Sequence, residues 1–174
     1  MHTQNHAPMI PEGEQRAKRP SPLRFVADAM LGRLAKWLRM MGYDVVYLRD
    51  TSDLEVLRRA RAESRLILTR DTALAQRAGK QAVFIHSQSL KEQLRELTRL
   101  GLIDGPLTNS RCPICNVPLR RISKREAQKR VPPFVYQTQT EFYECPACGR
   151  VYWAGTHWQH VQDTWRELGW EEED

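Results

Sequence analysis

The sequence has no long hydrophobic run. None of its 174 residues lies in an uninterrupted apolar stretch of 18 or more, the length that a transmembrane helix requires. Residues 1–21 also lack the apolar core of a signal peptide. We therefore expect a soluble, cytoplasmic protein with no membrane partner, whose oligomeric state the sequence leaves open.

Cysteine is scarce, and its placement is informative. The four cysteines form two CxxC pairs, Cys112 with Cys115 and Cys145 with Cys148. Disulfides are rare in the cytoplasm, and two such pairs in one short segment are more typical of metal ligands than of a redox pair or of buried thiols. Four thiolates are a preferred tetrahedral set for Zn²⁺ and leave no open position for catalysis. The sequence therefore predicts one structural Zn²⁺ ion.

Two signatures of phosphate chemistry are also missing. No glycine-rich loop of the kind that cradles a nucleotide is present. The residue two positions after Asp28 is Met30, whereas phosphoaspartate enzymes carry a second aspartate there. A phosphatase-like or signalling domain is therefore a weaker interpretation of this chain.

Short apolar runs alternate with helical patterns along the first half of the chain. The expected strands are 25–27, 44–48, 66–69 and 82–85, and the expected helices are 31–41, 54–63, 72–79 and 90–102. This alternation is typical of an α/β fold in which helices cover both faces of a central parallel sheet. The sequence predicts such a three-layer domain over residues 23–104.

The first helix has the clearest pattern. Its basic residues Arg33, Lys36 and Arg39 fall largely off the apolar stripe, so we expect them in solvent. Gly42 is suited to ending the helix. The stripe itself consists of Leu31, Leu34, Ala35, Leu38 and Met41.

Acidic residues follow three of the expected strands. Asp28 and Asp71 come directly after the first and third strands, and either Asp50 or Asp53 follows the second. The carboxyl ends of parallel strands share one edge of a sheet, where α/β proteins place their chemistry. Converging carboxylates favour Mg²⁺ or Mn²⁺, which suits phosphodiester hydrolysis. The alternative is that each aspartate only caps the helix that follows it.

The rest of the chain divides into three further segments. Residues 1–22 are rich in proline and polar side chains, so we expect a disordered arm. A break at residues 103–109 precedes an expected four-cysteine zinc ribbon with a C-terminal helix over 105–170, and residues 171–174 form an acidic tail. Within the ribbon we expect strands at 131–136 and 142–143, and the helix at 157–168.

Basic residues point to a polyanionic partner. The formal net charge is +6, and Glu126 is the one acid among the basic residues of 111–130. The charge alone does not distinguish nucleic-acid binding from solubility; together with the family resemblance described next, it makes RNA the expected partner, with a ribonucleoprotein or the ribosome as further candidates. The candidate RNA-binding residues are Arg33 and Arg70 in the first domain and Arg120, Arg121, Lys124 and Arg125 in the ribbon.

Several runs together resemble the Mut-seven C-terminal RNase domain family, a PIN-like nuclease fold with an appended zinc ribbon. They are FVADAMLGRLAKWLRMMGYD, SRLILTRD, RCPICN, ECPACGRVYW and GTH, and the similarity covers nearly all of residues 24–160. The resemblance implies a PIN-like sheet, a divalent metal at its acidic edge and RNA as substrate. Asp28 matches the first-strand acid and Asp71 the acid of the TRD motif. Asp53 best matches the middle acid that opens a helix, with Asp50 as its rival.

The sequence departs from the wider PIN pattern at one point. No acidic residue follows Asp71 before Glu92, so a fourth carboxylate at short distance is missing. The main hypothesis is a metal-dependent ribonuclease in which Asp28, Asp53 and Asp71 hold either one metal ion or one ion plus a second that the substrate phosphate recruits. The alternative is a non-catalytic RNA- or ribonucleoprotein-binding module.

Overall fold

The computed structural model of the chain describes residues 22–107 and 109–170. The arm expected at 1–22, apart from its last residue, and the acidic tail expected at 171–174 lie outside these described residues. Among the described residues, no helix combines the length and the apolar character needed to cross a membrane.

The first unit is the predicted α/β fold with a parallel sheet. Its strands are β1 (Phe25–Ala27), β2 (Val45–Tyr47), β3 (Leu66–Thr69) and β4 (Ala82–Phe84). They pair in the order β2-β1-β3-β4, and every pair is parallel. The helices are α1 (Gly32–Met40), α2 (Asp53–Ala62), α3 (Thr72–Ala78) and α4 (Leu90–Arg99), with short 3₁₀ turns at Ala29–Leu31 (η1) and Gly79–Gln81 (η2).

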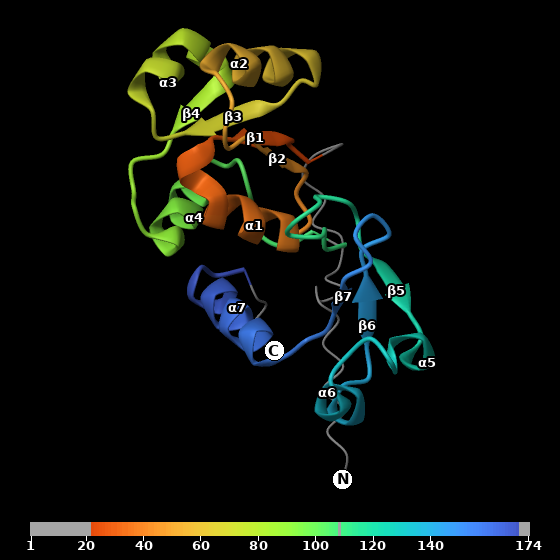
Figure 1. Cartoon of the computed structure of the whole chain (residues 1–174). Helices are drawn as coiled ribbons and strands as arrows, with labels where there is room; N and C mark the ends of the chain where they lie inside the picture. The colour runs from red at the N-terminus through yellow and green to blue at the C-terminus, as the bar shows by residue number, and fades with distance from the viewer. Residues whose placement is uncertain (1–21, 108, 171–174) are drawn as a thin grey trace.

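The helices form two layers around this sheet. Figure 1 shows α2 and α3 on one face and α1 and α4 on the other. Alternate side chains of β1 divide accordingly, because successive residues of a strand point to opposite faces. One core cluster consists of Val26, Val56, Leu57, Ala60, Ile67 and Leu74. The other includes Phe25, Ala27, Leu34, Leu38, Leu68, Leu94 and Leu97.

The stripe predicted for the first helix is confirmed, because its five apolar residues are at most 1% exposed. The helix ends at Met40 with Met41 as its C-cap, and the next residue, Gly42, has a φ of +98° and packs against the chain before the first cysteine. A Cβ atom at Gly42 would lie 2.5 Å from the Asn109 carbonyl oxygen. The expectation that Arg39 lies in solvent is wrong, since it is only 8% exposed and bonds to the ribbon.

The ribbon, defined here as residues 110–153, is a second small unit. Its strands β5 (Arg120–Ile122), β6 (Phe142–Glu144) and β7 (Val151–Tyr152) form an antiparallel sheet in that order. Two short helices, α5 (Lys124–Ala127) and α6 (Pro133–Thr138), lie between β5 and β6. The ribbon has its own core, made of Ile122, Ala127, Val131 and Phe142.

The strand expected at residues 131–136 is wrong, because most of this segment is the helix α6. Pro133 occupies the first turn of α6, where the fixed φ of proline suits a helix and its missing N–H costs nothing. Val135 and Tyr136 then pack against the ribbon core. The strand expected at 142–143 is confirmed as β6.

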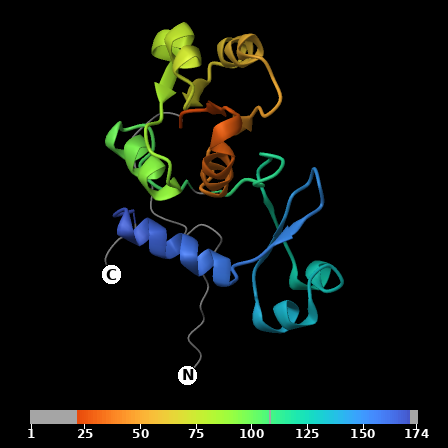
Figure 2. The same cartoon turned by 60° about the vertical axis from the view of Figure 1, so that its left-hand side comes forward.

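The C-terminal helix α7 (Thr156–Glu167) returns to the first unit. Val161, Trp165 and the later Trp170 belong to the same core cluster as α1 and α4, and Lys91 of α4 forms an ion pair with Glu167. Figures 1 and 2 both show α7 beside α4 rather than within the ribbon. The predicted segment 105–170 therefore contributes its helix to the core of the α/β unit, although the domain limits themselves stay a prediction.

Candidate active site and metal centre

Asp28 and Asp71 are connected at the carboxyl edge of the sheet. Strand β1 ends at Ala27, which pairs with Leu68 of β3, so Asp28 follows β1 next to Thr69. The fully buried Thr69 hydroxyl donates to Asp28 Oδ2. The same hydroxyl oxygen accepts the backbone N–H of Asp71 at 2.9 Å. One side chain thus links the two predicted acids on the two central strands.

Each of these acids also caps the helix that follows it. Asp28 Oδ1 accepts the N–H of Met30 at 3.2 Å, at the start of η1. Asp71 Oδ1 accepts the N–H groups of Ala73 at 2.8 Å and Leu74 at 3.2 Å, at the start of α3. The capping role weighed for these aspartates is therefore real. It leaves Asp71 Oδ2 with no hydrogen bond among the described residues, while Asp28, only 9% exposed, uses both oxygens.

The middle acid has a different environment. Asp53 is the first residue of α2, whose N-cap is Ser52. Asp53 Oδ2 lies 3.7 Å from an Arg77 guanidinium nitrogen on α3, and Asp50 is exposed in the loop after β2. In the described part of the chain, Asp28, Asp53 and Asp71 are not gathered into one metal-sized group. Their role as a shared metal site stays a prediction.

The four cysteines do gather. The Sγ atoms of Cys112, Cys115, Cys145 and Cys148 all lie within 4.8 Å of one another. A tetrahedral ion with metal–sulfur bonds of about 2.3 Å requires sulfur–sulfur separations of about 3.8 Å, and Cys112 Sγ lies 4.0 Å from Cys148 Sγ. This donor set fits a metal ion such as Zn²⁺.

Both cysteine pairs turn backbone amides toward sulfur. Cys115 N donates to Cys112 Sγ at 3.4 Å and Cys148 N to Cys145 Sγ at 3.5 Å. These turns end on residues with left-handed backbone, Asn116 at φ +63° and Gly149 at φ +75°. Asparagine and glycine are the residues that adopt this conformation most easily.

Tyr152 helps to lower the pKa of the Cys112 thiol. Burial raises the pKa of Cys112, but hydrogen bonds from the Tyr152 hydroxyl, 3.1 Å from Sγ, and from backbone amides outweigh it and bring the pKa to about 7. Burial also raises the pKa of Cys145. The lowered pKa favours the thiolate form of Cys112, which is the form that binds a metal ion.

The first cysteine turn is fixed to the amino-terminal edge of the α/β sheet. Asn116 Oδ1 accepts the N–H of Val45 at 3.0 Å, on the edge strand β2, and Asn116 Nδ2 donates to Asp44 Oδ1 at 2.7 Å. From α1, Arg39 donates to the carbonyl oxygens of Val45 and Pro113, both at 2.8 Å. The cysteine cluster thus lies at the sheet edge opposite to Asp28 and Asp71.

Asp44 is the charged centre of this junction. Burial raises its pKa, but hydrogen bonds from Arg65 and Asn116 outweigh this effect and the pKa lies below its usual value. Arg65, which is 6% exposed, donates to Asp44 Oδ1 at 2.7 Å and to the Phe25 carbonyl at 3.2 Å. The junction therefore connects the ribbon to β1 and β2 through buried, charge-assisted bonds.

Residues 23–165 of the chain match the family model of the Mut7-C RNAse domain. The chain belongs to this family. Membership confirms the expected resemblance and indicates a nuclease-type function. Searches of curated proteins and of solved structures gave no match.

The basic candidates of this Mut7-C RNAse domain are dispersed. Arg120 and Arg130 pair with Glu144, and Arg121 lies 3.3 Å from Glu141. Lys124 lies 4.9 Å from the centre of the Tyr136 ring. Most of the predicted basic residues of the ribbon therefore have partners within the ribbon itself.

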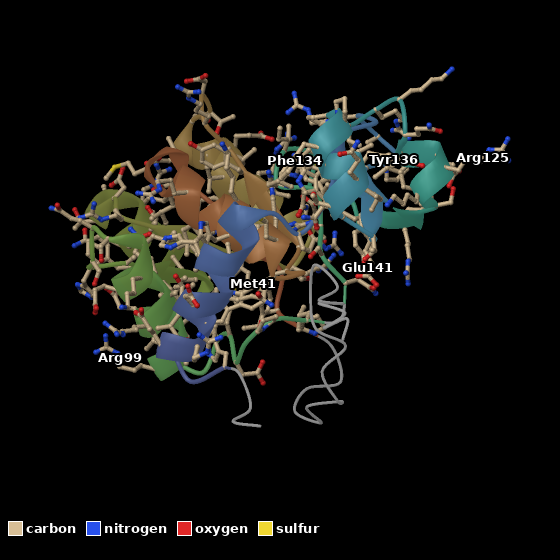
Figure 3. All side chains as sticks on the ribbon, turned by 90° about the horizontal axis from the view of Figure 1, so that it is seen from below. Met41, Arg99, Arg125, Phe134, Tyr136 and Glu141 are labelled. Carbon is tan, nitrogen blue, oxygen red and sulfur yellow. The ribbon has the colours of Figure 1, made fainter. Side chains whose placement is uncertain are left out.

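Three candidates remain without such pairing in the described part of the chain. Arg125 is exposed, and Figure 3 shows it at the outer end of the ribbon, pointing away from the α/β unit. Arg33 is exposed on α1. Arg70 sits between Thr69 and Asp71, and its buried Nε has no hydrogen-bond partner among the described residues.

Sequence reasoning missed two residues that organise these sites. Thr69 links the acids, and its signal was a hydroxyl at the end of a buried strand, two positions before Asp71. Asn116 holds the edge of β2, and its signal was an asparagine just after a CxxC turn. Both contacts join distant parts of the chain, which a local pattern does not reveal.

Proposed function

We propose that this chain is a divalent-metal-dependent ribonuclease that hydrolyses RNA phosphodiester bonds at the carboxyl edge of its sheet. The observation that supports this most is the pair of acids held together by Thr69 on the two central strands, in a chain of the Mut7-C RNAse domain family. In parallel sheets this edge is where chemistry is placed.

The proposed site assigns a role to each acid. Asp28, Asp71 and the middle acid Asp53 would hold Mg²⁺ or Mn²⁺, because hard cations prefer carboxylate oxygens. When bound, the ion supplies positive charge at the scissile phosphate and lowers the pKa of the attacking water. Thr69 and the Met30 N–H orient Asp28, and the Asp71 oxygen that is free of hydrogen bonds faces no competing donor among the described residues.

The four cysteines have a structural role in this proposal. Cys112, Cys115, Cys145 and Cys148 would hold Zn²⁺ in a closed thiolate shell. Asn116 and Arg39 join the first cysteine turn to the α/β unit, so the ion would fix the ribbon relative to the sheet. In this position the ribbon would aid RNA binding.

The proposal is tested by cleavage of a labelled single-stranded RNA in Mn²⁺. We expect Asp28→Asn and Asp71→Asn each to lower the rate by about 100-fold or more, the order found when one preorganised charge contact is removed. Asp163→Asn is the matched control, because Asp163 lies on α7 and its side chain is 61% exposed. If both edge variants cleave as fast as the wild type, the activity is contamination and the proposal fails.

A second candidate function is a non-catalytic RNA- or ribonucleoprotein-binding module. It is favoured by the missing fourth carboxylate after Asp71 and by the separation of Asp53 from the other two acids. It predicts salt-sensitive RNA binding, weakened by charge reversal at Arg120, Arg121 and Lys124, with no cleavage at saturating Mn²⁺. Cleavage that depends on Asp28 would exclude it.

A further inference from the structure

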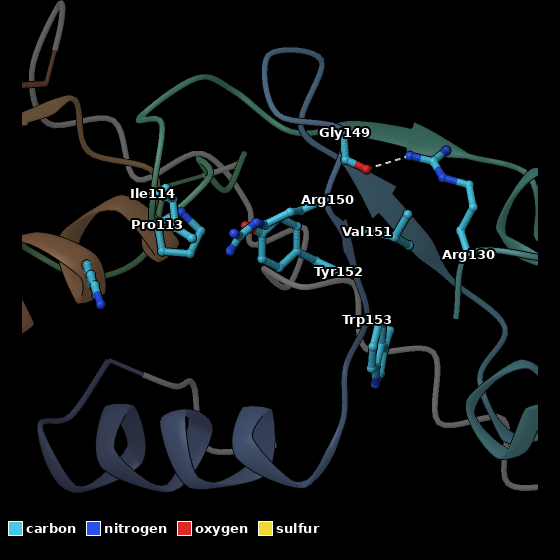
Figure 4. Close-up of a pocket in the computed structure, with 9 residues that line it drawn as sticks. Pro113, Ile114, Arg130, Gly149, Arg150, Val151, Tyr152 and Trp153 are labelled. Atoms are coloured by element: carbon cyan, nitrogen blue, oxygen red, sulfur yellow. Dashed lines mark hydrogen bonds between the residues drawn. The ribbon is translucent and has the colours of Figure 1, made fainter. Parts of the chain in front are cut away.

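A cavity of about 460 Å³ lies between the ribbon and α1. Pro113 and Ile114 of the first cysteine turn form one wall, and residues 149–153 around β7 form another. Figure 4 shows Tyr152 and Arg150 facing Pro113 and Ile114 across this space. Lys36 of α1 and Arg130 complete the lining. The volume is within the range of small-ligand sites.

The charge of the cavity suits an anion. Its lining includes Lys36, Arg130 and Arg150 but no acidic side chain. Arg130 is held in place by Glu144 at 2.7 Å and by the Gly149 carbonyl at 2.6 Å. Lys36 and Arg150 are exposed, and neither has an ion pair within residues 22–107 and 109–170. These two cations are therefore available for phosphate groups.

The apolar part of the lining suits a nucleobase. Tyr152 and Trp153 are half-buried, and Ile114 keeps 51% of its surface exposed. The hydroxyl of Tyr152 is bonded to Cys112 at 3.1 Å, so its ring has a fixed orientation. Fixed aromatic rings beside cations form a stacking platform for unpaired bases, whereas the bases of a duplex are already paired and stacked.

Helix α1 connects this cavity to the acidic edge. Arg33 precedes Lys36 by about one turn, and both are exposed. At 1.5 Å of rise per residue, the chain from Asp28 to Lys36 spans about 12 Å. Figure 1 shows α1 extending from the end of the sheet where β1 terminates toward the ribbon. A few nucleotides of extended single-stranded RNA cover this path.

We propose that this cavity is a binding subsite for single-stranded RNA, with a base against the Tyr152 ring and phosphates on Lys36 and Arg150. The inference rests on the proposed ribonuclease function and adds the place where the substrate is held away from the cut. In this proposal the main RNA contact of the ribbon is not Arg120, which pairs with Glu144, but the side of the ribbon that faces α1 and carries Arg150.

The test measures binding separately from cleavage. Fluorescence anisotropy of a labelled single-stranded RNA 12-mer is recorded over a range of salt concentrations, with full-length, zinc-loaded protein carrying Asp28→Asn. The double variant Lys36→Glu/Arg150→Glu is compared with Arg61→Glu/Lys80→Glu. The control makes the same charge change at exposed residues of α2 and η2, away from the cavity lining. Zinc content and circular dichroism verify that all variants fold.

We expect the cavity variant to bind at least 10-fold more weakly. The slope of log affinity against log salt should fall by about 1.4, since each phosphate contact to a single strand contributes about 0.7. The control should stay within twofold of its parent. Equal affinity of the cavity variant and its parent, or an equal loss in the control, would overturn the subsite. Equally tight binding of a duplex of the same sequence would overturn the assignment to single strands.

This outcome is independent of the catalytic proposal. A wild-type protein that binds RNA through Lys36 and Arg150 but never cleaves it would refute the ribonuclease and keep the subsite. A protein that cleaves RNA in an Asp28-dependent way, and whose RNA affinity is unchanged by the cavity variant, would refute the subsite and keep the ribonuclease.

Discussion

Replacing Thr69 by valine tests how the acidic edge is held together. Valine keeps the shape of the fully buried threonine but removes the hydroxyl that donates to Asp28 and accepts from the Asp71 N–H. A hydrogen bond to a charged group contributes about 1.5–3 kcal/mol, and a buried N–H without an acceptor costs about 1–3 kcal/mol. Because Asp28 keeps the Met30 N–H as a donor, we expect a loss near 3 kcal/mol.

Thermal unfolding of zinc-loaded protein, followed by circular dichroism, measures this loss. For a chain of this size each kcal/mol lowers Tm by about 2–4 °C, so Thr69→Val should lower it by about 6–12 °C. Thr69→Ser keeps the hydroxyl and removes one methyl group, which costs about 1 kcal/mol. The reasoning is refuted if Thr69→Val melts with the wild type, or if Thr69→Ser is as damaging as Thr69→Val.

Three further predictions concern the junction between the ribbon and the α/β unit. Gly42→Ala should lower the free energy of unfolding in a urea melt by about 3 kcal/mol or more, because the new Cβ meets the backbone and the residue has a positive φ. Gly101→Ala should lower it by about 1 kcal/mol, because φ is +71° but the new Cβ has no atom within 4 Å. Arg39→Met should cost about 3 kcal/mol through lost bonds to buried carbonyls, whereas Arg33→Met on the exposed face of the same helix should be nearly neutral. Removal of bound zinc by a chelator should speed hydrogen exchange of the Val45 amide, which Asn116 holds; unchanged exchange would show that the ribbon does not depend on metal to stay docked.

The sheet could be predicted because its signals are local. The two central strands, β1 and β3, are buried and read as short apolar runs, and the stripe from Leu31 to Met41 sets the buried face of α1. The turn to helix at Pro133 was missed because Val135 and Tyr136 favour strands by composition, while their packing against the ribbon core decides the structure.

The sites were only partly accessible from the sequence. The cysteine cluster was foreseen because each CxxC turn is a local motif. The burial of Arg39 was not, because its partners Val45 and Pro113 come from β2 and from the ribbon. The same holds for Thr69, whose two contacts depend on the register between β1 and β3. For Asp53 the sequence was informative in one respect only. Its place at the start of α2 follows from the local pattern, but its distance from Asp28 depends on the tertiary fold.

The most direct measurement is a crystal structure of the zinc-loaded protein soaked with Mn²⁺, with the ion located by its anomalous scattering. The proposed function predicts Mn²⁺ at the carboxyl edge of the sheet, coordinated by Asp28 and Asp71, with Asp53 drawn toward it. An edge that stays empty at saturating Mn²⁺, with both carboxylates still capping η1 and α3, would contradict the metal-dependent ribonuclease.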